Sequence, residues 1–233
     1  MRFVGERRAI AAASLSLFMV ILILNGIAGG GPARAMILGL GFAYLVAFLG
    51  VVAGWFWARW YTLGLAFSGV TLAAMLGWQQ GWDLPEVWII GGFHGVACLV
   101  LLGDDAASAF DGRRDWRERL HMDENAVNRL GKAVMRAGAS LPYLIVAGLA
   151  PRQSLDVGSL ALLLAVLGLG ATLHLRTWGL FVMAGAAALS WVSGGGTAFT
   201  TLGLPAVPWI GAALLTAALL PFAAPIARSL RRD

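Results

Sequence analysis

A histidine and a cysteine four positions apart are the residues of this chain best suited to chemistry. His94 and Cys98 fall within one apolar run, and helical spacing places both side chains on the same face. Imidazole and thiolate groups bind soft metals such as copper or zinc, but a site needs about four ligands, and His121 and His174 are expected at other depths. The alternative is a neutral His94 that hydrogen-bonds to a neighbouring helix, with Cys98 as a small packing residue.

Other polar side chains within the apolar part of the chain are few. Four of them are candidates for a solute path and equally for ordinary hydrogen bonds between helices: Asn25, Tyr44, Gln79 and Gln80. No Asp, Glu, Lys or Arg is expected near the middle of a membrane span, so the carboxylate relays of proton-driven pumps are missing. We also find no catalytic Ser, His and Asp set and no glycine-rich phosphate loop. The sequence therefore leans against an enzyme and predicts no cofactor.

The composition requires these residues to be positioned by helices in a membrane. Of 233 residues, 59% are hydrophobic and 12% are charged, which no soluble domain of this size matches. The apolar runs are continuous rather than alternating, and a backbone in hydrocarbon must satisfy its own hydrogen bonds, so we expect helices rather than a β-barrel. The net charge of +5 indicates membrane orientation and contact with membrane lipid, and we expect no nucleic-acid partner.

The predicted fold is all-α, a polytopic bundle of eight transmembrane helices in the cell inner membrane. Seven apolar runs are plain candidates: 9–27, 35–57, 60–78, 84–103, 157–174, 177–192 and 205–227. The eighth, 137–150, has the length of a re-entrant segment, but charge favours a full crossing. If it crosses, both chain ends lie in the cytoplasm, and every Lys and Arg except Arg34 and Arg152 faces inward.

Tryptophan positions agree with these spans, because the amphipathic indole ring prefers the headgroup level. The inner ends of predicted spans carry Trp55, Trp57, Trp60 and Trp178. At or near the outer ends are Trp78, Trp82, Trp88, Trp191 and Trp209.

One hydrophilic stretch, residues 104–136, divides the spans four and four. We therefore expect a first four-helix half (1–103), a charged cytoplasmic loop (104–136) and a second four-helix half (137–233). From Asp123, which suits a helix cap, the loop has the two faces of an amphipathic helix lying on the cytoplasmic leaflet. Its charged residues predict either a surface for lipid or a protein partner or an ordinary solvated linker: Asp104, Asp105, Arg129, Lys132 and Arg136.

The two halves have features of an internal parallel repeat. The segments 84–91 (LPEVWIIG) and 204–211 (LPAVPWIG) share five of eight residues and open corresponding spans. Because each half has an even number of spans, the copies would be related by an axis along the membrane normal. Coincidence in a chain rich in Leu, Ala and Gly is the alternative.

Small residues at four-residue spacing predict contacts between helices of one bundle and, as the second alternative, a homodimer face, since helices in lipid associate through close backbone approach. Such positions are Gly39, Ala43, Ala47, Gly91, Gly95, Ala184 and Ala188. Prolines predict bends, at Pro142 in the fifth span and at Pro221 and Pro225 in the last.

Three functions remain open on the sequence. The first is a non-enzymatic integral inner-membrane protein, an accessory or assembly component that contacts protein partners or lipid. The second is a small carrier or channel for an uncharged or lipid-like solute, which a polar cavity of substrate size between the halves would favour. The third is an intramembrane metal or redox enzyme at His94 and Cys98, which requires further ligands to converge there. No feature of the sequence indicates an oligomeric state.

Overall fold

The protein is all helical throughout the residues that its computed structural model describes, which are 4–31, 33–103, 106, 110, 123–150, 156–193 and 207–230. Within these ranges there are eight helices and no strand. The helices are α1 (Val4–Ala28), α2 (Arg34–Ala53), α3 (Ala58–Gln80), α4 (Pro85–Leu101), α7 (Glu124–Leu149), α8 (Val157–Leu173), α9 (Trp178–Ser193) and α10 (Val207–Leu230). The all-α prediction is confirmed, and each helix overlaps one predicted span.

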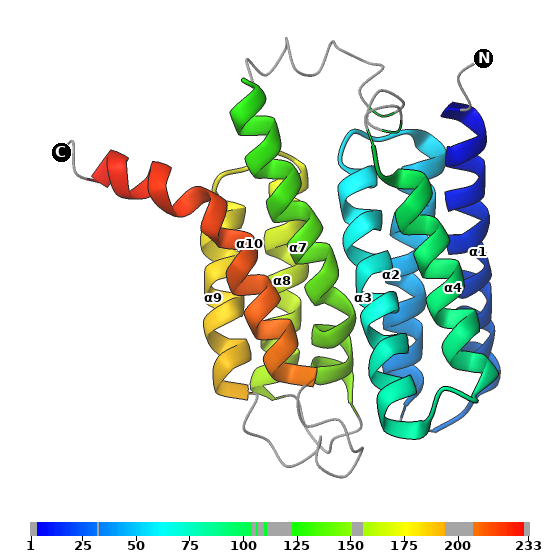
Figure 1. Cartoon of the computed structure of the whole chain (residues 1–233). Coiled ribbons are helices and arrows are strands. Elements are labelled where there is room, and N and C mark those ends of the chain that lie inside the picture. Colours follow the sequence, from blue (N-terminus) through cyan, green and yellow to red (C-terminus); the bar gives the residue numbers. More distant parts are fainter. Residues whose placement is uncertain are drawn as a thin grey trace.

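The helices lie side by side in two groups of four (Figure 1). In each group, α1 to α4 and α7 to α10, every helix packs on the next and the last packs on the first. The groups meet mainly through α7, which packs on α3 and α2. In the predicted repeat, α1 corresponds to α7 and α3 to α9. A two-fold axis would therefore turn the contact of α3 with α7 into a contact of α9 with α1, yet α1 and α9 lie on opposite sides of the molecule (Figure 1). The internal repeat therefore stays a prediction, and the two groups are not arranged around a two-fold axis.

Three helices are long and apolar enough to cross a membrane, as judged by length and composition. They are Gly5–Ala28, Arg34–Ala53 and Ala58–Gln80. Four shorter helices are also apolar: Pro85–Leu101, Val157–Leu173, Trp178–Ser193 and Val207–Ala223. Three apolar helices of this length indicate a membrane protein.

Helix α7 runs without interruption through the predicted boundary at residue 136. The stretch that was expected to lie on the membrane surface and the short span 137–150 form one helix of 26 residues. The carboxylate of Asp123 caps it, as predicted, by accepting a hydrogen bond of 2.6 Å from the Ala126 N–H. A separate surface helix is therefore not present, because Val127, Leu130 and Val134 bury the same face that continues into the bundle. As a result, α1 begins and α10 ends at the same end of the molecule (Figure 1).

Helices α3 and α7 touch backbone to backbone. A Cβ atom on Gly64 would overlap the Met135 carbonyl oxygen, and one on Gly138 would lie 2.9 Å from the Tyr61 carbonyl oxygen. Across the same contact, the Ser68 hydroxyl donates to the Ala139 carbonyl at 2.5 Å. Such a contact needs small residues on both helices, and it fixes how the two groups sit against each other.

Two arginines close the carboxyl ends of helices in the first group. The Arg8 guanidinium donates to the Val51 carbonyl at 2.9 Å near the end of α2, and Arg59 Nε donates to the Leu101 carbonyl at 2.9 Å at the end of α4. Both bonds place positive charge at the negative end of a helix dipole and satisfy carbonyls that the helix leaves open. Helix α2 ends before its predicted boundary because Gly54, with a left-handed φ of 68°, closes it.

The last helix bends in the region where the sequence predicts a bend. Pro221 and Pro225 lie inside α10, and its final turns lean away from the bundle (Figure 1). Pro221 has no N–H to offer the Ala217 carbonyl one turn earlier, and the Arg136 guanidinium donates to that carbonyl at 2.7 Å. Arg136 therefore joins α7 to α10.

The small residues predicted as helix contacts divide into two sets. Four of them face other parts of the fold: Gly39, Ala43, Ala47 and Gly91. A side chain at Gly95 would meet nothing within 4 Å, and Ala184 and Ala188 are exposed, so the predicted contacts within the bundle were wrong at these three positions. Four-residue spacing occurs on every face of a helix, and it does not tell which face is turned inward.

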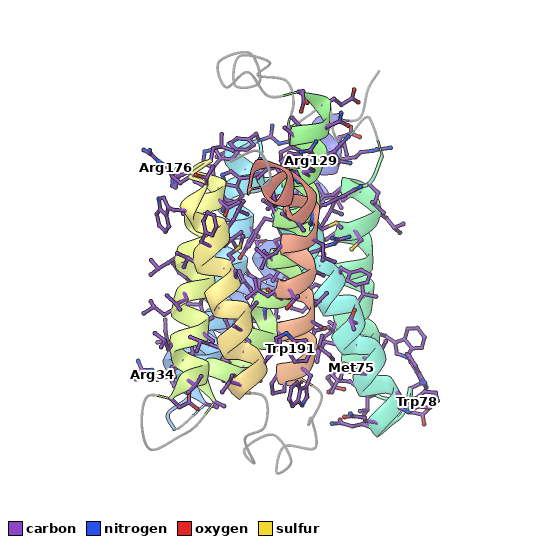
Figure 2. The ribbon with its side chains drawn as sticks, turned by 90° about the vertical axis from the view of Figure 1, so that its left-hand side faces the viewer. Arg34, Met75, Trp78, Arg129, Arg176 and Trp191 are labelled. Atoms are coloured by element: carbon purple, nitrogen blue, oxygen red, sulfur yellow. The ribbon has the colours of Figure 1, made fainter. Side chains whose placement is uncertain are left out.

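Tryptophans gather toward both ends of the bundle. Trp78 and Trp191 lie at the end opposite to Arg129 and Arg176 (Figure 2). The side chain of Trp78 is 86% exposed, as expected for a ring at the headgroup level. Trp60 instead packs inward against Gly131 of α7.

Candidate functional site

A buried hydrogen bond joins α2 to α4 within the first group of helices. The Tyr44 hydroxyl lies 2.5 Å from Nε2 of His94, and both side chains are buried. Nδ1 of His94 lies 2.7 Å from the Ile90 carbonyl, one turn earlier on α4. Because a carbonyl only accepts, Nδ1 carries a proton, and in a neutral ring Nε2 then accepts a hydrogen bond from Tyr44. This hydrogen bond to a neighbouring helix is the one that the sequence offers as the alternative to a metal ligand at His94.

Aromatic rings and a glycine hold the imidazole in place. The Phe18 ring of α1 lies 4.3 Å from the imidazole and 5.7 Å from the Tyr44 ring, measured between centroids. On the side of α3, any side chain at Gly69 would overlap the imidazole. Each of the four helices of the first group therefore contributes to the surroundings of His94.

A cavity of about 180 Å³ adjoins this pair, between the two groups of helices. The first group contributes Leu40 and Leu72 to its wall, and α7 contributes Pro142, Tyr143 and Val146. Among the described residues that line it, none is charged. The volume is below the roughly 300 Å³ at which typical small-molecule pockets begin, so it accommodates one end of a molecule rather than a large ligand.

Hydroxyl groups supply most of the polar atoms at the cavity wall. Ser68 donates to the Ala139 carbonyl, and the Tyr143 hydroxyl interacts with those of Ser68 and Thr71. The Tyr44 hydroxyl donates a hydrogen bond to His94, and its oxygen keeps lone pairs that can accept a further hydrogen bond. The cavity is therefore suited to an uncharged, mainly apolar guest.

The two residues predicted as metal ligands are used separately. His94 lines the cavity described above, whereas Cys98 lines another of about 250 Å³ that also includes Arg136. Both ring nitrogens of His94 already take part in hydrogen bonds. In the described part of the chain, no three His, Cys, Asp or Glu side chains gather as metal ligands. The metal site therefore stays a prediction to which the geometry adds no further ligand.

Of the four side chains predicted for a solute path, the structure brings Tyr44 to the cavity. Asn25 is exposed, and its amide donates to the Ile21 carbonyl of its own helix at 2.8 Å. Gln79 and Gln80 are exposed at the end of α3. These three are surface residues of the bundle.

The residues predicted for a cytoplasmic interaction surface have different environments. Asp104 and Asp105 lie outside the described residues. Lys132 is exposed, Arg129 is half-buried, and Arg136 is hydrogen-bonded to α10. The predicted interaction surface of five residues therefore stays a prediction.

Sequence reasoning missed residues of both groups of helices that line the cavity. Ser68 and Gly69 shape its wall from α3, and Tyr143 does so from α7. One signal was available, because Gly64 and Ser68 form a small-residue pair at four-residue spacing. Tyr143 carried no such signal, since its role depends on how α7 packs.

Comparisons with known proteins give no family for this chain: no family model matches it, and neither does any curated protein or solved structure.

Proposed function

We propose that this chain is a non-enzymatic integral inner-membrane protein that binds an uncharged, lipid-like molecule between its two groups of helices, as a small carrier does. The single observation that carries the proposal is the cavity beside Tyr44 and His94. It lies between the halves, where a carrier of this design would bind its solute. From the sequence, a polar cavity would have favoured a carrier. The wall of this cavity is mainly apolar, which favours a lipid-like solute over a polar one.

In this proposal all eight helices cross the membrane, with both chain ends in the cytoplasm. Support comes from the arginines, because Arg129 and Arg176 lie at the end that carries both termini, and Arg34 lies at the other end (Figure 2). The shortest helices, α4, α8 and α9, have 16 or 17 residues. At about 1.5 Å per residue they reach roughly 25 Å, a mismatch that local bilayer thinning accommodates.

Native mass spectrometry of the protein released gently from its own membrane tests the binding. We expect the wild type to retain an uncharged, lipid-like molecule. Val146→Trp fills the cavity and should abolish retention, whereas Val166→Trp on the exposed face of α8 should retain the molecule. A wild type that carries no such molecule contradicts the proposal, as does equal retention by Val146→Trp.

The hydroxyl of Tyr44 gives a finer test with dodecanol as the probe. Tyr44→Phe keeps the ring and removes the oxygen that would accept from the alcohol. We expect a loss of about 1 kcal/mol, or about fivefold in affinity, in a dodecanol titration followed by native mass spectrometry. Unchanged affinity would place the bound alcohol elsewhere.

An accessory role is the second candidate, and the start of α7 favours it. The first turns of α7 extend past α8 and α9 (Figure 1) and expose Asn125, Asn128 and Lys132. The same mass spectra decide between the candidates. A partner subunit that is lost from Lys132→Glu would favour the accessory role, and a protein without partners would weaken it.

A further inference from the structure

A second site lies at the end of the bundle that carries both termini. Here a pocket of about 320 Å³ is bordered by Arg129 of α7, by Arg176 in the turn between α8 and α9, and by Phe222 of α10. Figure 2 shows both arginines at this end. Leu130, Leu175 and Leu180 give the pocket an apolar floor. The pocket therefore combines two positive charges with an apolar surface.

These two arginines differ from others at the same end. Arg8 donates to a carbonyl near the end of α2 and Arg136 to the Ala217 carbonyl within α10, so their guanidinium groups are committed to the fold. Neither the guanidinium group of Arg129 nor that of Arg176 forms an ion pair or a hydrogen bond with any residue that the structure describes. No acidic residue belongs to the described lining of the pocket. Within the described part of the chain, nothing occupies the donors of either guanidinium group.

An apolar groove continues from the pocket along the outside of the bundle. It has a volume of about 290 Å³, lies between α9 and α10, and shares Leu180 and Phe222 with the pocket. Phe181 and Leu220 border the groove and are 67% and 62% exposed, so this face meets the lipid in a membrane protein. A ligand that reaches from the arginines into the groove therefore needs an anionic head and an apolar tail.

We propose that the pocket and the groove together bind one anionic phospholipid of the cytoplasmic leaflet. The phosphate lies between Arg129 and Arg176, because a guanidinium presents paired donors that match phosphate oxygens. One acyl chain follows the groove between α9 and α10. Two cations without a described acidic neighbour favour a lipid of net negative charge over a zwitterionic one. This site is separate from the cavity beside His94, so its test does not depend on the proposed function.

The charge requirement is tested with two lipids that share their acyl chains. The full-length protein in detergent is titrated with phosphatidylglycerol or phosphatidylcholine, and native mass spectrometry counts the bound lipids. We expect one tightly held phosphatidylglycerol and weaker binding of phosphatidylcholine. Two basic residues near an anionic lipid correspond to about thirtyfold in affinity, so Arg129→Gln with Arg176→Gln should lose about that factor for phosphatidylglycerol. Lys132→Gln, one turn along α7 and outside the pocket, should bind as the wild type does.

The groove is tested without any change of charge. Ala184 is exposed and borders the groove, so Ala184→Trp should obstruct the acyl chain and weaken binding at least about tenfold, without disturbing the interior. Ala188→Trp is the matched control, because Ala188 is exposed on the same helix and lies outside the groove. Glycerol 3-phosphate, an anionic head without a tail, should not compete with the lipid.

Three results would overturn the proposal. They are equal binding of the two lipids by the wild type, retention of phosphatidylglycerol by the double arginine variant, and competition by glycerol 3-phosphate. Unchanged binding by Ala184→Trp would also reject the groove as the path of the acyl chain. The elution volume of each variant on gel filtration verifies that it remains folded, and since the changed side chains are exposed or half-buried we expect no shift.

Discussion

Helices α1 and α7 both run along the length of the bundle, yet their sequences differ in hydropathy and in the size of their side chains. The most apolar stretch of α1 has a mean hydropathy of 2.3, and 22% of it is buried. Helix α7 begins with charged residues and continues with Ala, Gly and Ser, and it is not among the helices that qualify as membrane spans by composition. It nevertheless packs on α2, α3, α8 and α10 and buries residues from Val127 to Gly148. Helix α7 is the helix through which the two groups mainly contact each other.

The difference between the two helices shows what hydropathy measures in this protein. A helix surrounded by lipid needs large apolar side chains, whereas a helix surrounded by other helices needs small ones that allow close approach. Helix α3 is intermediate, with a mean hydropathy of 1.3 and 56% of its most apolar stretch buried. A weakly apolar segment such as 137–150 is therefore compatible with a position at the centre of the molecule.

The contact between α3 and α7 should be the most sensitive point of the fold. Gly64→Val would place a side chain against the Met135 carbonyl, where the backbone of α7 cannot move aside. We expect a loss of about 3 kcal/mol or more, seen as a lower midpoint of thermal unfolding in detergent. The control is Gly92→Val on α4, where a Cβ atom meets nothing within 4 Å. Equal midpoints for the two variants would contradict the central role of this contact.

Arg136 should rank next, because its loss leaves a half-buried carbonyl without its donor. Arg136→Met keeps the length of the side chain but removes the bond to the Ala217 carbonyl beside Pro221. An unsatisfied buried acceptor costs about 1–3 kcal/mol, which thermal unfolding would register. Lys132→Met removes the same charge from an exposed position and should change the midpoint little. If both variants behave alike, charge rather than the hydrogen bond explains the effect of Arg136.

The smallest effect concerns the hydroxyl that links the two groups. Ser68→Ala removes the bond to the Ala139 carbonyl of α7, and an interhelical hydrogen bond in a membrane contributes about 0.6 kcal/mol. Ser16→Ala in α1 removes a bond of the same type to the Ala13 carbonyl of its own helix. We expect chemical denaturation to detect the first variant and not the second. A larger loss of stability from Ser16→Ala than from Ser68→Ala would contradict the greater importance of contacts to α7.

Sequence reasoning located the helices because continuous apolar runs are visible without tertiary information. It also identified Asp123 as a cap and Pro221 with Pro225 as the place of a bend. It separated α7 into two elements, since the change from charged to apolar residues at Arg136 resembles a boundary. The structure shows instead that the same buried face continues past this residue.

The candidate site was predictable only in part. Tyr44 and His94 both stood out as polar residues in apolar runs, but their hydrogen bond spans fifty positions of the chain and has no local signal. The sequence also did not show which face of each helix is turned inward, since Ala184 and Ala188 were predicted as contacts and are exposed. Which face of an apolar helix meets protein or lipid depends on its neighbours, and lipid places no polar pattern on the other face.

The direction of the chain after α7 is the point on which the account depends most. Reporters that are active on only one side of the membrane, fused after Asp233 and in place of residue 153 between α7 and α8, measure it directly. We expect a cytoplasmic signal at the carboxyl terminus and an external signal at residue 153. A carboxyl-terminal reporter on the outside, or residue 153 in the cytoplasm, would contradict the crossing of α7 and the proposed arrangement of eight spans.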